Sequence, residues 1–352
     1  MNFDEVSELM QENKKLKEEM YHMKCSISEL CGVVDQIVKI VNGEQENIDR
    51  LLNSVGALQA TDNNLKYEIM DKLGFQNNFF CPQFRSDEET IRLIVEEGKS
   101  LGRFGDGEFS IAFDIPRQKF QHLDEQLKER IWQVLQTEND RFLIAIAKNY
   151  GCLDRYNEQG ATGIRMYMTE ETRMLHQKIL PAHTVFSDAY ITRPYVIHKD
   201  NMTEAPRKRF EALKAIWQDK DIVFVEGAQT RLGVGNDLFE NVKSIRRILA
   251  PATSSFDRYE DILKKCLEIA ESVDLFMLAI GPSSGILAFD LSEKGYQAVD
   301  VGHIDIEYEW FLAGQGIRVP IPNKYNNEVD GGDIVEDIDN PLYQSQVICS
   351  FA

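Results

Sequence analysis

Apolar runs that alternate with amphipathic stretches constrain the fold of this 352-residue chain most strongly. Each run is apolar almost throughout, which is typical of parallel strands covered on both faces, and the stretches between them have helical periodicity. The runs span residues 142–147, 221–227, 244–251, 274–281 and 297–302, and the helical stretches span 123–138, 204–217, 257–272 and 284–294. The pattern predicts an α/β fold, with a mostly parallel, Rossmann-like sheet and helices on both of its faces.

A heptad repeat precedes this domain. Apolar residues recur in alternating steps of three and four from Val6 to Ile69, which amounts to about nine heptads. Most a positions are β-branched and many d positions are leucine, which favours a parallel dimer, and Asn13 at an a position would help to fix the register. The alternative is an amphipathic helix packed on its own domain, which would drift out of a strict 3.5-residue frame over this length.

These patterns divide the chain into four parts. We predict a coiled-coil stalk at 1–72 that makes a homodimer, a linker at 73–90, a globular domain at 91–330 and an acidic tail at 331–352.

Composition excludes several classes of protein. The formal net charge of -19 argues against a nucleic-acid binder, because phosphate backbones need clustered Lys and Arg. A phosphorylated ligand would require local positive charge or a recruited cation. The six cysteines form no CxxC pair, which excludes a zinc framework or a disulfide scaffold. The N-terminus lacks the apolar region of a signal peptide, and no apolar run is long enough for a transmembrane segment, so we expect a cytoplasmic protein.

In α/β sheets of this kind, ligands bind beyond the carboxyl ends of the strands. The segment LGRFGDGEFSIAF places Asp106 and Glu108 on either side of Gly107. Two carboxylates on a glycine-rich bend can converge on one hard cation, and Arg103 just before them is placed to meet a phosphate. The alternative is an ordinary acidic turn, because acidic turns that contain glycine are common.

A second candidate follows the run at 221–227. Glu226 ends that run, and the glycine-rich loop after it carries Arg231, Asn236 and Asp237 as candidate ligand-binding residues. The glycine spacing matches neither the P-loop nor the GxGxxG motif. A structural alternative is that Asp237 caps a following helix.

A third candidate is AIGPSSGILAFDL, in which a strand runs into a turn and then an apolar helix. Free backbone N–H groups and the helix dipole at such a place bind anions readily, so Gly281, Ser283 and Ser284 are candidates for phosphate contact. An ordinary tight turn with Ser283 or Ser284 as the N-cap is the alternative.

The segment AVDVGHIDIEYEWF is the most informative. If it is extended, its period of two places His303, Asp305, Glu307 and Glu309 on one face. Neighbouring carboxylates repel each other unless a cation or a proton relieves them, so this row predicts a metal ligand and a general base. A solvated edge strand is the alternative. In the separate segment AYITRPYVI, Arg193 could hold a phosphate or lie in a surface turn.

Together these segments resemble a known family. RFGDGE, AYITRPY, IVFVEGAQTRLGVGNDLF, RRILAP, AIGPSSGILAFDL, VDVGHIDIEYEWF and NKYNNE resemble the GT-D family of glycosyltransferases in the right order, over about residues 85–330. The resemblance implies a Rossmann-like enzyme that transfers a sugar, typically glucose from UDP-glucose, to a glycan in bacterial surface-glycan assembly. It also implies a divalent cation, usually Mn²⁺ with Mg²⁺ as the alternative, held by a D-x-E element that is Asp106–Gly107–Glu108 here.

We therefore expect a glycosyltransferase with a UDP-sugar donor and a glycan or glycoprotein acceptor. Arg103 and the amides near Gly281 to Ser284 would assist the cation on the diphosphate, with Arg231 or Arg193 as a second positive contact.

In an inverting transfer Asp305 or Glu307 would take the acceptor proton, with His303 beside them. Two alternatives stay open: a hydrolase of nucleotide sugars or other diphosphates, and a non-catalytic scaffold that binds glycan while the coiled coil recruits partners.

Overall fold

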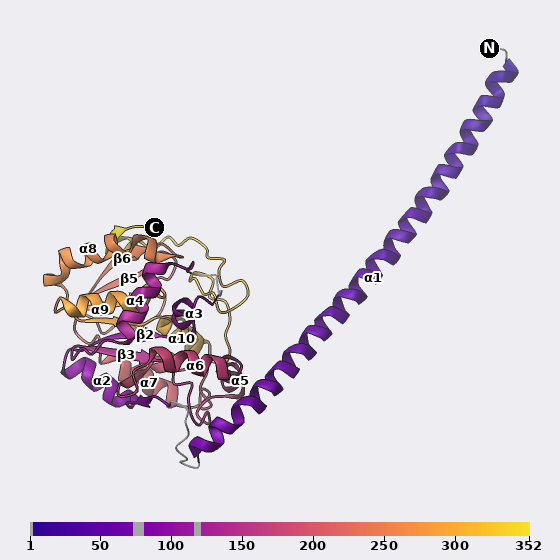
Figure 1. Ribbon diagram of the computed structural model, residues 1–352. Coiled ribbons are helices and arrows are strands. Elements are labelled where there is room, and N and C mark those ends of the chain that lie inside the picture. The colour runs from indigo at the N-terminus through magenta and orange to yellow at the C-terminus, as the bar shows by residue number, and fades with distance from the viewer. Residues whose placement is uncertain (1–2, 73–80, 116–120) are drawn as a thin grey trace. The chain divides into compact units, whose positions relative to one another are not determined.

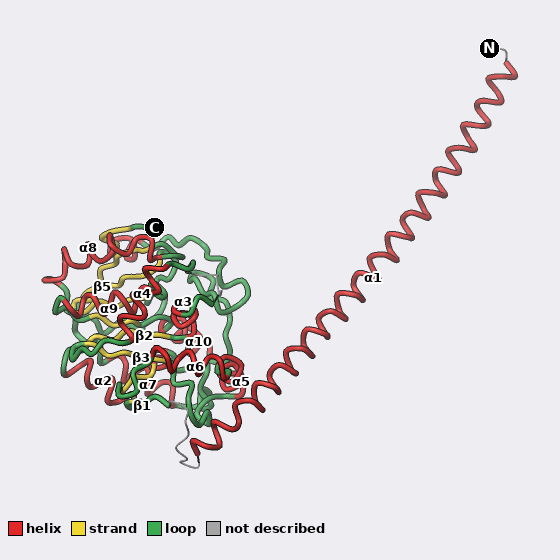
Figure 2. Tube along the Cα trace, viewed as in Figure 1, coloured by secondary structure: helices red, strands yellow, loops and turns green. Residues whose placement is uncertain are grey.

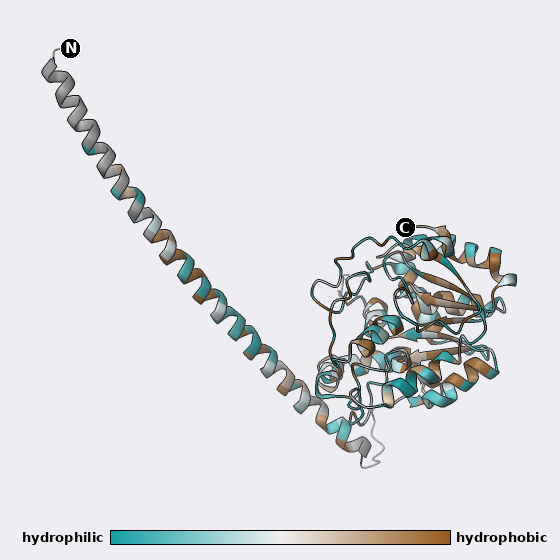
Figure 3. Ribbon diagram, turned by 180° about the vertical axis from the view of Figure 1, so that it is seen from behind, coloured by the Kyte–Doolittle hydropathy of each residue, from teal (hydrophilic) through white to brown (hydrophobic). Residues whose placement is uncertain are grey.

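The computed structural model describes residues 3–72, 81–115 and 121–352, and the chain forms two compact units, Met1–Gln59 and Ala60–Ala352. Helix α1 spans Phe3–Lys72, which confirms that the heptad region is helical. Apolar heptad residues along it, among them Val34, Val41, Leu51 and Leu58, are exposed, and Figure 3 shows apolar and polar residues following one another along the helix. Pairing of two such helices stays a prediction.

The second unit contains a nine-stranded parallel sheet with the order β1-β4-β3-β2-β8-β7-β5-β6-β9. Its strands are β1 (Gln83–Phe84), β2 (Ser100–Phe104), β3 (Phe142–Ile146), β4 (Val185–Asp188), β5 (Asp221–Gly227), β6 (Ser244–Ala250), β7 (Leu275–Ala279), β8 (Ala298–Asp300) and β9 (Val347–Ser350). The five predicted apolar runs are β3, β5, β6, β7 and β8, so the predicted fold class is confirmed.

Helices cover both faces of the sheet (Figures 1 and 2). They are α2 (Asp87–Glu96), α3 (Asp106–Ala112), α4 (Glu125–Leu135), α5 (Glu158–Tyr167), α6 (Glu170–Ile179), α7 (Ala205–Lys214), α8 (Tyr259–Ile269), α9 (Ser283–Glu293), α10 (Ile304–Ala313) and α11 (Pro341–Gln346), with 3-10 turns η1 (Ala189–Thr192), η2 (Ser255–Arg258) and η3 (Ala270–Ser272). Residues 83–90 of the predicted linker form β1 and the start of α2, and the predicted tail contains α11 and β9. Residues 73–80 of that linker lie outside the described residues. No helix in the described chain is long and apolar enough to cross a membrane.

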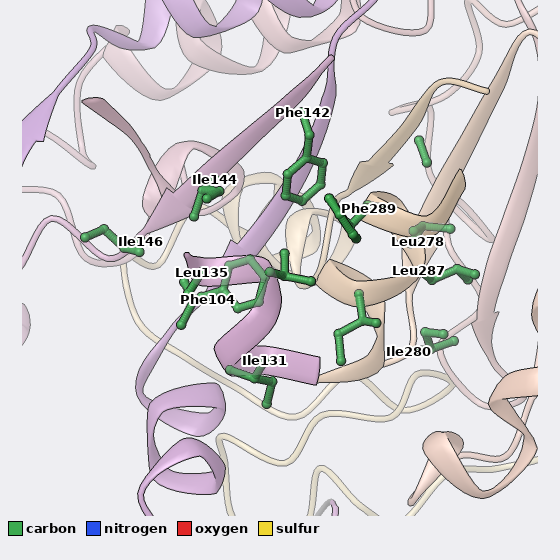
Figure 4. Close-up of a cluster of buried hydrophobic side chains, with 14 of the residues drawn as sticks. Phe104, Ile131, Leu135, Phe142, Ile144, Ile146, Leu278, Ile280, Leu287 and Phe289 are labelled. Carbon is green, nitrogen blue, oxygen red and sulfur yellow. The ribbon is translucent and has the colours of Figure 1, made fainter. Parts of the chain in front are cut away.

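Two apolar cores form because successive strand residues point to opposite faces. On β5, for example, Val223 and Val225 belong to one core and Ile222 and Phe224 to the other. Figure 4 shows the first core, where β2, β3 and β7 pack against α4 and α9. The second core packs the other face against α2, α7 and α10. Burial on both faces explains why these strands are apolar along their whole length.

The segment from His303 to Glu309 forms the start of helix α10, and not the predicted strand. The expected row of four side chains on one face therefore does not exist. In a helix Asp305 and Glu309 lie one turn apart on the same face, whereas Glu307 points elsewhere. The alternation of apolar and acidic residues resembles a half-buried strand because this helix is buried on more than one side, with Ile304, Asp305, Ile306 and Glu307 all buried.

The order of the strands places a switch point between β2 and β8. The chain leaves β2 toward β3 on one side, and it leaves β8 toward β9 on the other side. Close packing supports this junction: a Cβ on Gly102 of β2 would lie 2.9 Å from the carbonyl oxygen of Gly285 in α9. Such a switch point opens a crevice at the carboxyl ends of the strands, where ligands bind in open α/β sheets.

Candidate active site

A cavity of about 900 Å³ occupies this crevice. Its walls come from the residues that follow β2, β3, β7 and β8, from α5, and from the segment after α10. The cavity is lined by eight of the predicted site residues, Arg103, Asp106, Glu108, Arg193, Gly281, Ser284, His303 and Asp305. The other six, Glu226, Arg231, Asn236, Asp237, Ser283 and Glu307, are not part of the lining.

Asp106 and Glu108 lie in the first turn of α3. Asp106 is exposed to the cavity, whereas the Glu108 carboxylate folds back and accepts a hydrogen bond from the Gly105 N–H at 2.7 Å. Burial raises the pKa of Glu108 to about 7. Within the described chain no group of three or more His, Cys, Asp or Glu side chains is placed to hold a metal. Hard carboxylate oxygens suit Mn²⁺ or Mg²⁺, but a cation here would take its remaining ligands from water and phosphate oxygens.

Arg103 holds the junction of β2 and β8 together. Its Nε lies 3.3 Å from the Asp300 carboxylate, and its Nη1 donates to Thr192 Oγ1 at 2.7 Å. Burial raises the pKa of Asp300, and the guanidinium of Arg103 opposes that rise. Sequence reasoning missed Asp300, which lies inside the predicted run 297–302 and is the last residue of β8. Arg103 therefore has partners within the protein and shares its charge between them and any phosphate in the cavity.

The acidic side chains of α10 are neutralised by a lysine that sequence reasoning also missed. Lys324 donates to Asp305 Oδ2 at 2.7 Å and to Glu309 Oε1 at 2.6 Å. Asn236 donates to the same two carboxylates at 2.8 and 2.7 Å, and the Gly233 N–H donates to Asp305 at 2.9 Å. Lys324 and Asp305 are almost fully buried, and the Lys324 ammonium with its hydrogen-bonded neighbours relieves the repulsion between the carboxylates of Asp305 and Glu309.

A second polar cluster at the cavity consists of Arg193, Glu328 and His303. Arg193 makes a bidentate pair with Glu328 and also donates to His303 Nδ1 at 3.2 Å. Arg318 Nε lies 3.4 Å from the same Glu328 carboxylate. Burial would raise the pKa of Glu328, but Arg193 and its neighbours hold it well below the usual range. Burial also lowers the pKa of His303 to about 4, so its imidazole is neutral at pH 7.

Glu307 lies behind this group, fully buried. One of its oxygens accepts hydrogen bonds from the backbone N–H groups of Tyr195 and Val196, at 3.1 and 2.9 Å. Arg318 and Glu328 were not predicted as site residues. The only sequence signal for Glu328 was its place in the segment NKYNNE.

The glycine-rich loop after β5 lines the cavity with Thr230 and Leu232, but its predicted site residues are not part of the lining. Glu226 pairs with Arg247 inside the protein, and both side chains are almost fully buried. Arg231 donates to the carbonyl oxygens of Asn323 and Glu336, at 2.9 and 2.7 Å, and so anchors the segment after α10. Asp237 accepts a hydrogen bond from Tyr308 and lies in a turn with no helix directly after it.

At the third predicted segment, Gly281 and Ser284 line the cavity at the start of α9. Ser283 instead bonds to Ser255 Oγ at 3.0 Å in the interior. Neither serine acts as the N-cap, because the side chain of Ser284 accepts from the Ile280 N–H and the helix has no side-chain cap.

A family model described as "Glycosyltransferase GT-D fold" matches residues 101–329. The chain belongs to the GT-D family of glycosyltransferases. This confirms the predicted family and places the cavity within the matched region.

Individual relatives agree with this GT-D assignment. The chain is 32% identical over 270 residues to a probable glycosyl transferase, Gly, of Streptococcus gordonii, and 32% identical over 269 residues to the glycosyltransferase GlyD of Streptococcus pneumoniae. Each match covers 76% of this chain, which spans 38% and 32% of the two relatives.

Two solved structures share the fold. A structure described as a new glycosyltransferase from Streptococcus sanguinis is 30% identical with a TM-score of 0.72, and the match covers 77% of this chain and all of that one. A second, described as a highly conserved domain of unknown function with a distinct glycosyltransferase fold, is 31% identical with a TM-score of 0.72, and that match covers 80% of this chain and 98% of that one.

Proposed function

We propose that this GT-D chain transfers a sugar, glucose in the first instance, from a UDP-sugar donor to a glycan or glycoprotein acceptor in bacterial surface-glycan assembly. The observation that carries the proposal is the cavity at the switch point, which joins the acidic pair Asp106 and Glu108 to Arg193 and Arg318. A nucleoside diphosphate carries several negative charges, and an acidic protein needs a cation and placed arginines to stabilise it as a leaving group.

Each part of the site has a role in this proposal. Asp106 and Glu108 would hold Mn²⁺ or Mg²⁺, which when bound neutralises charge on the leaving diphosphate. Arg193 adds positive charge, and the backbone at Gly281 and Ser284 faces the same space.

Of the two predicted bases, Asp305 and Glu307, only Asp305 lines the cavity. In an inverting transfer Asp305 would therefore take the proton from the acceptor hydroxyl. His303 also lines the cavity, but burial lowers the pKa of its imidazole to about 4, which makes it a weak base.

Titration of UDP into the purified protein tests the site directly. We expect binding in the presence of Mn²⁺ that EDTA abolishes, and Asp106→Asn should weaken it by at least about a hundredfold, because loss of a metal ligand costs more than loss of a group that supports one. Glu260→Gln, which removes an exposed carboxylate on α8, is the matched control and should change nothing. A folded protein that binds no UDP under any of these conditions would disprove the proposal.

We also propose that α1 pairs with α1 of a second copy as a parallel coiled coil. The exposed apolar a and d residues support this, since a helix with such a stripe is stabilised by covering it. Sedimentation equilibrium of the full chain should give the mass of a dimer. The double substitution Val34→Glu and Ile37→Glu should give a monomer, whereas Lys39→Glu at an outward position should not. A wild-type monomer at micromolar concentration would contradict the pairing.

A further inference from the structure

One wing of the cavity lies against α5 and differs from the rest in its chemistry. We call it the α5 wing, and it includes Asn149, Gln159, Gly163, Ile164, Tyr167 and Ile197. Its neighbours in the lining are also uncharged: Ala147, Asn157, Gly160, Tyr190 and Val196. In the part of the chain that the structure describes, the residues of this wing therefore carry amide, aromatic and aliphatic side chains and no charged one.

The α5 helix is fixed at its start and on its far side. Asn157 caps it by accepting from the Gly160 N–H at 2.8 Å, and it donates to the Val196 carbonyl at 2.7 Å. On the far side, Arg165 makes two hydrogen bonds to Glu68, at 2.7 and 2.9 Å. These contacts hold the wall of the wing in place before any ligand arrives.

Two glycines on α5 face the cavity, and packing requires only one of them. A Cβ on Gly160 would lie 3.1 Å from the Ile197 carbonyl oxygen, so a neighbour limits the side chain there. A Cβ on Gly163 would meet no atom within 4 Å, so the space in front of it is open. Glycine inside a helix costs about 1 kcal/mol relative to alanine, and nothing in the protein's own packing offsets that cost at Gly163. Its effect is to keep the wing wide.

The aromatic ring of Tyr167 is held rigidly at one side of the wing. Its hydroxyl bonds to His176 Nε2 at 3.0 Å, and His176 Nδ1 bonds to the Tyr150 hydroxyl at 2.6 Å. The imidazole stacks on Phe109 of α3 with ring centroids 4.0 Å apart. A small adjoining cavity is lined by Tyr167, Asn149 and Asp106 together, so the wing adjoins the acidic element of α3.

A fixed aromatic ring with aliphatic neighbours and nearby carboxamides suits a sugar ring, whose C–H face packs on apolar groups while its hydroxyls bond to amides. Among the described residues that form this wing there is no Lys or Arg, so a phosphate or carboxylate group there would lack a cation to compensate for its lost water. We propose that the α5 wing is the acceptor subsite, that it binds an uncharged sugar residue, and that Gly163 sets the size of the sugar it admits. This inference rests on the proposed transferase function.

Saturation-transfer NMR on the full chain holding UDP and Mg²⁺ tests this subsite. The probes are methyl glucoside, methyl galactoside and methyl N-acetylglucosaminide, with glucose 6-phosphate as the charged comparison. We expect ring-proton signals from at least one neutral glycoside and none from the phosphate. Gly163→Leu should remove those signals while leaving UDP affinity within twofold, because leucine favours a helix and fills only the wing. Met166→Leu is the matched control on an α5 residue outside the lining, and it should keep the signals.

Three outcomes would overturn the subsite. They are equal glycoside signals from Gly163→Leu and the wild type, signals from the sugar phosphate alone, and no glycoside signal from a wild type that holds UDP. Failure of the wild type to bind UDP at all would instead overturn the transferase proposal on which the subsite rests, so the two failures are distinguishable.

Discussion

Arg247→Met is expected to lower the free energy of unfolding by about 3–5 kcal/mol. Arg247 is 2% exposed and its partner Glu226 is fully buried, so the substitution leaves a carboxylate without a counter-ion inside the protein. It also removes hydrogen bonds to the Leu232 carbonyl and to Gln346, at 2.9 and 2.8 Å. Most of the lost stability comes from the unpaired carboxylate of Glu226, and the lost hydrogen bonds contribute less.

Urea denaturation of the full chain measures this effect. The double variant Arg247→Met with Glu226→Leu should recover most of the loss, because neither buried charge remains. Arg246→Met changes the neighbouring arginine, which is half-buried and, among the described residues, donates hydrogen bonds only to Ser272 and to no carboxylate. This substitution should therefore cost no more than about 1 kcal/mol. If the stable double variant still binds UDP, Glu226 supports the fold and does not hold the ligand. A loss of less than about 1 kcal/mol in the single variant would contradict the argument.

Gly302→Ala is expected to destabilise the protein by roughly 2–4 kcal/mol and to weaken UDP binding at least about tenfold. Gly302 has a φ of +46°, and a Cβ there would lie 1.7 Å from Nη2 of Arg103. The guanidinium must move, which breaks its pair with Asp300 at the floor of the cavity.

Gly98→Ala provides the control for Gly302→Ala. Gly98 has a φ of +65°, and a Cβ there would meet no atom within 4 Å, so the substitution introduces backbone strain of about 1–2 kcal/mol without a clash. Thermal unfolding and UDP titration of both variants separate strain from displacement of Arg103. Equal stability and equal UDP affinity in the two variants would show that Arg103 is not held as described.

Five of the nine strands could be predicted because parallel strands buried on both faces leave a continuous apolar signature, as in β5 and β7. Strands β1, β2, β4 and β9 were not predicted. The helix α10 could not be predicted, because the partner of its buried acidic residues, Lys324, is not part of any local sequence pattern. Lys324 lies 19 residues beyond Asp305 in an irregular segment, and its charge makes the acidic residues compatible with a buried helix. Without knowledge of that lysine, alternation of apolar and acidic residues favours a strand.

The site was predictable where a glycine-containing segment comes just after a strand, as at Asp106 after β2 and Gly281 after β7. The same rule misplaced Arg231 and Asp237. Other residues of their loop line the cavity, whereas Arg231 bonds to the segment after α10 and Asp237 bonds to Tyr308 within α10. Asp300 was missed because its partner Arg103 is 197 residues away in the sequence, so neither residue signals the other. The α5 wing has no motif at all, since a wide space beside a glycine becomes visible only in three dimensions.

The sheet consists of two halves, each drawn from one continuous stretch of chain. Strands β1 to β4 come from residues 83–188 and β5 to β9 come from residues 221–350. Within the sheet, the two halves pair only where β2 lies beside β8. Pairing β2 with β8 closes a loop of nearly two hundred residues, because Leu101 pairs with Val299. The strand pairs within each half close shorter loops, so their pairing has a smaller entropic cost. Because the cavity straddles the junction, a chain with only one folded half offers a nucleotide no complete site. On the proposed function, a nucleotide donor therefore binds only where both halves are folded, and its binding would stabilise the pairing of β2 with β8.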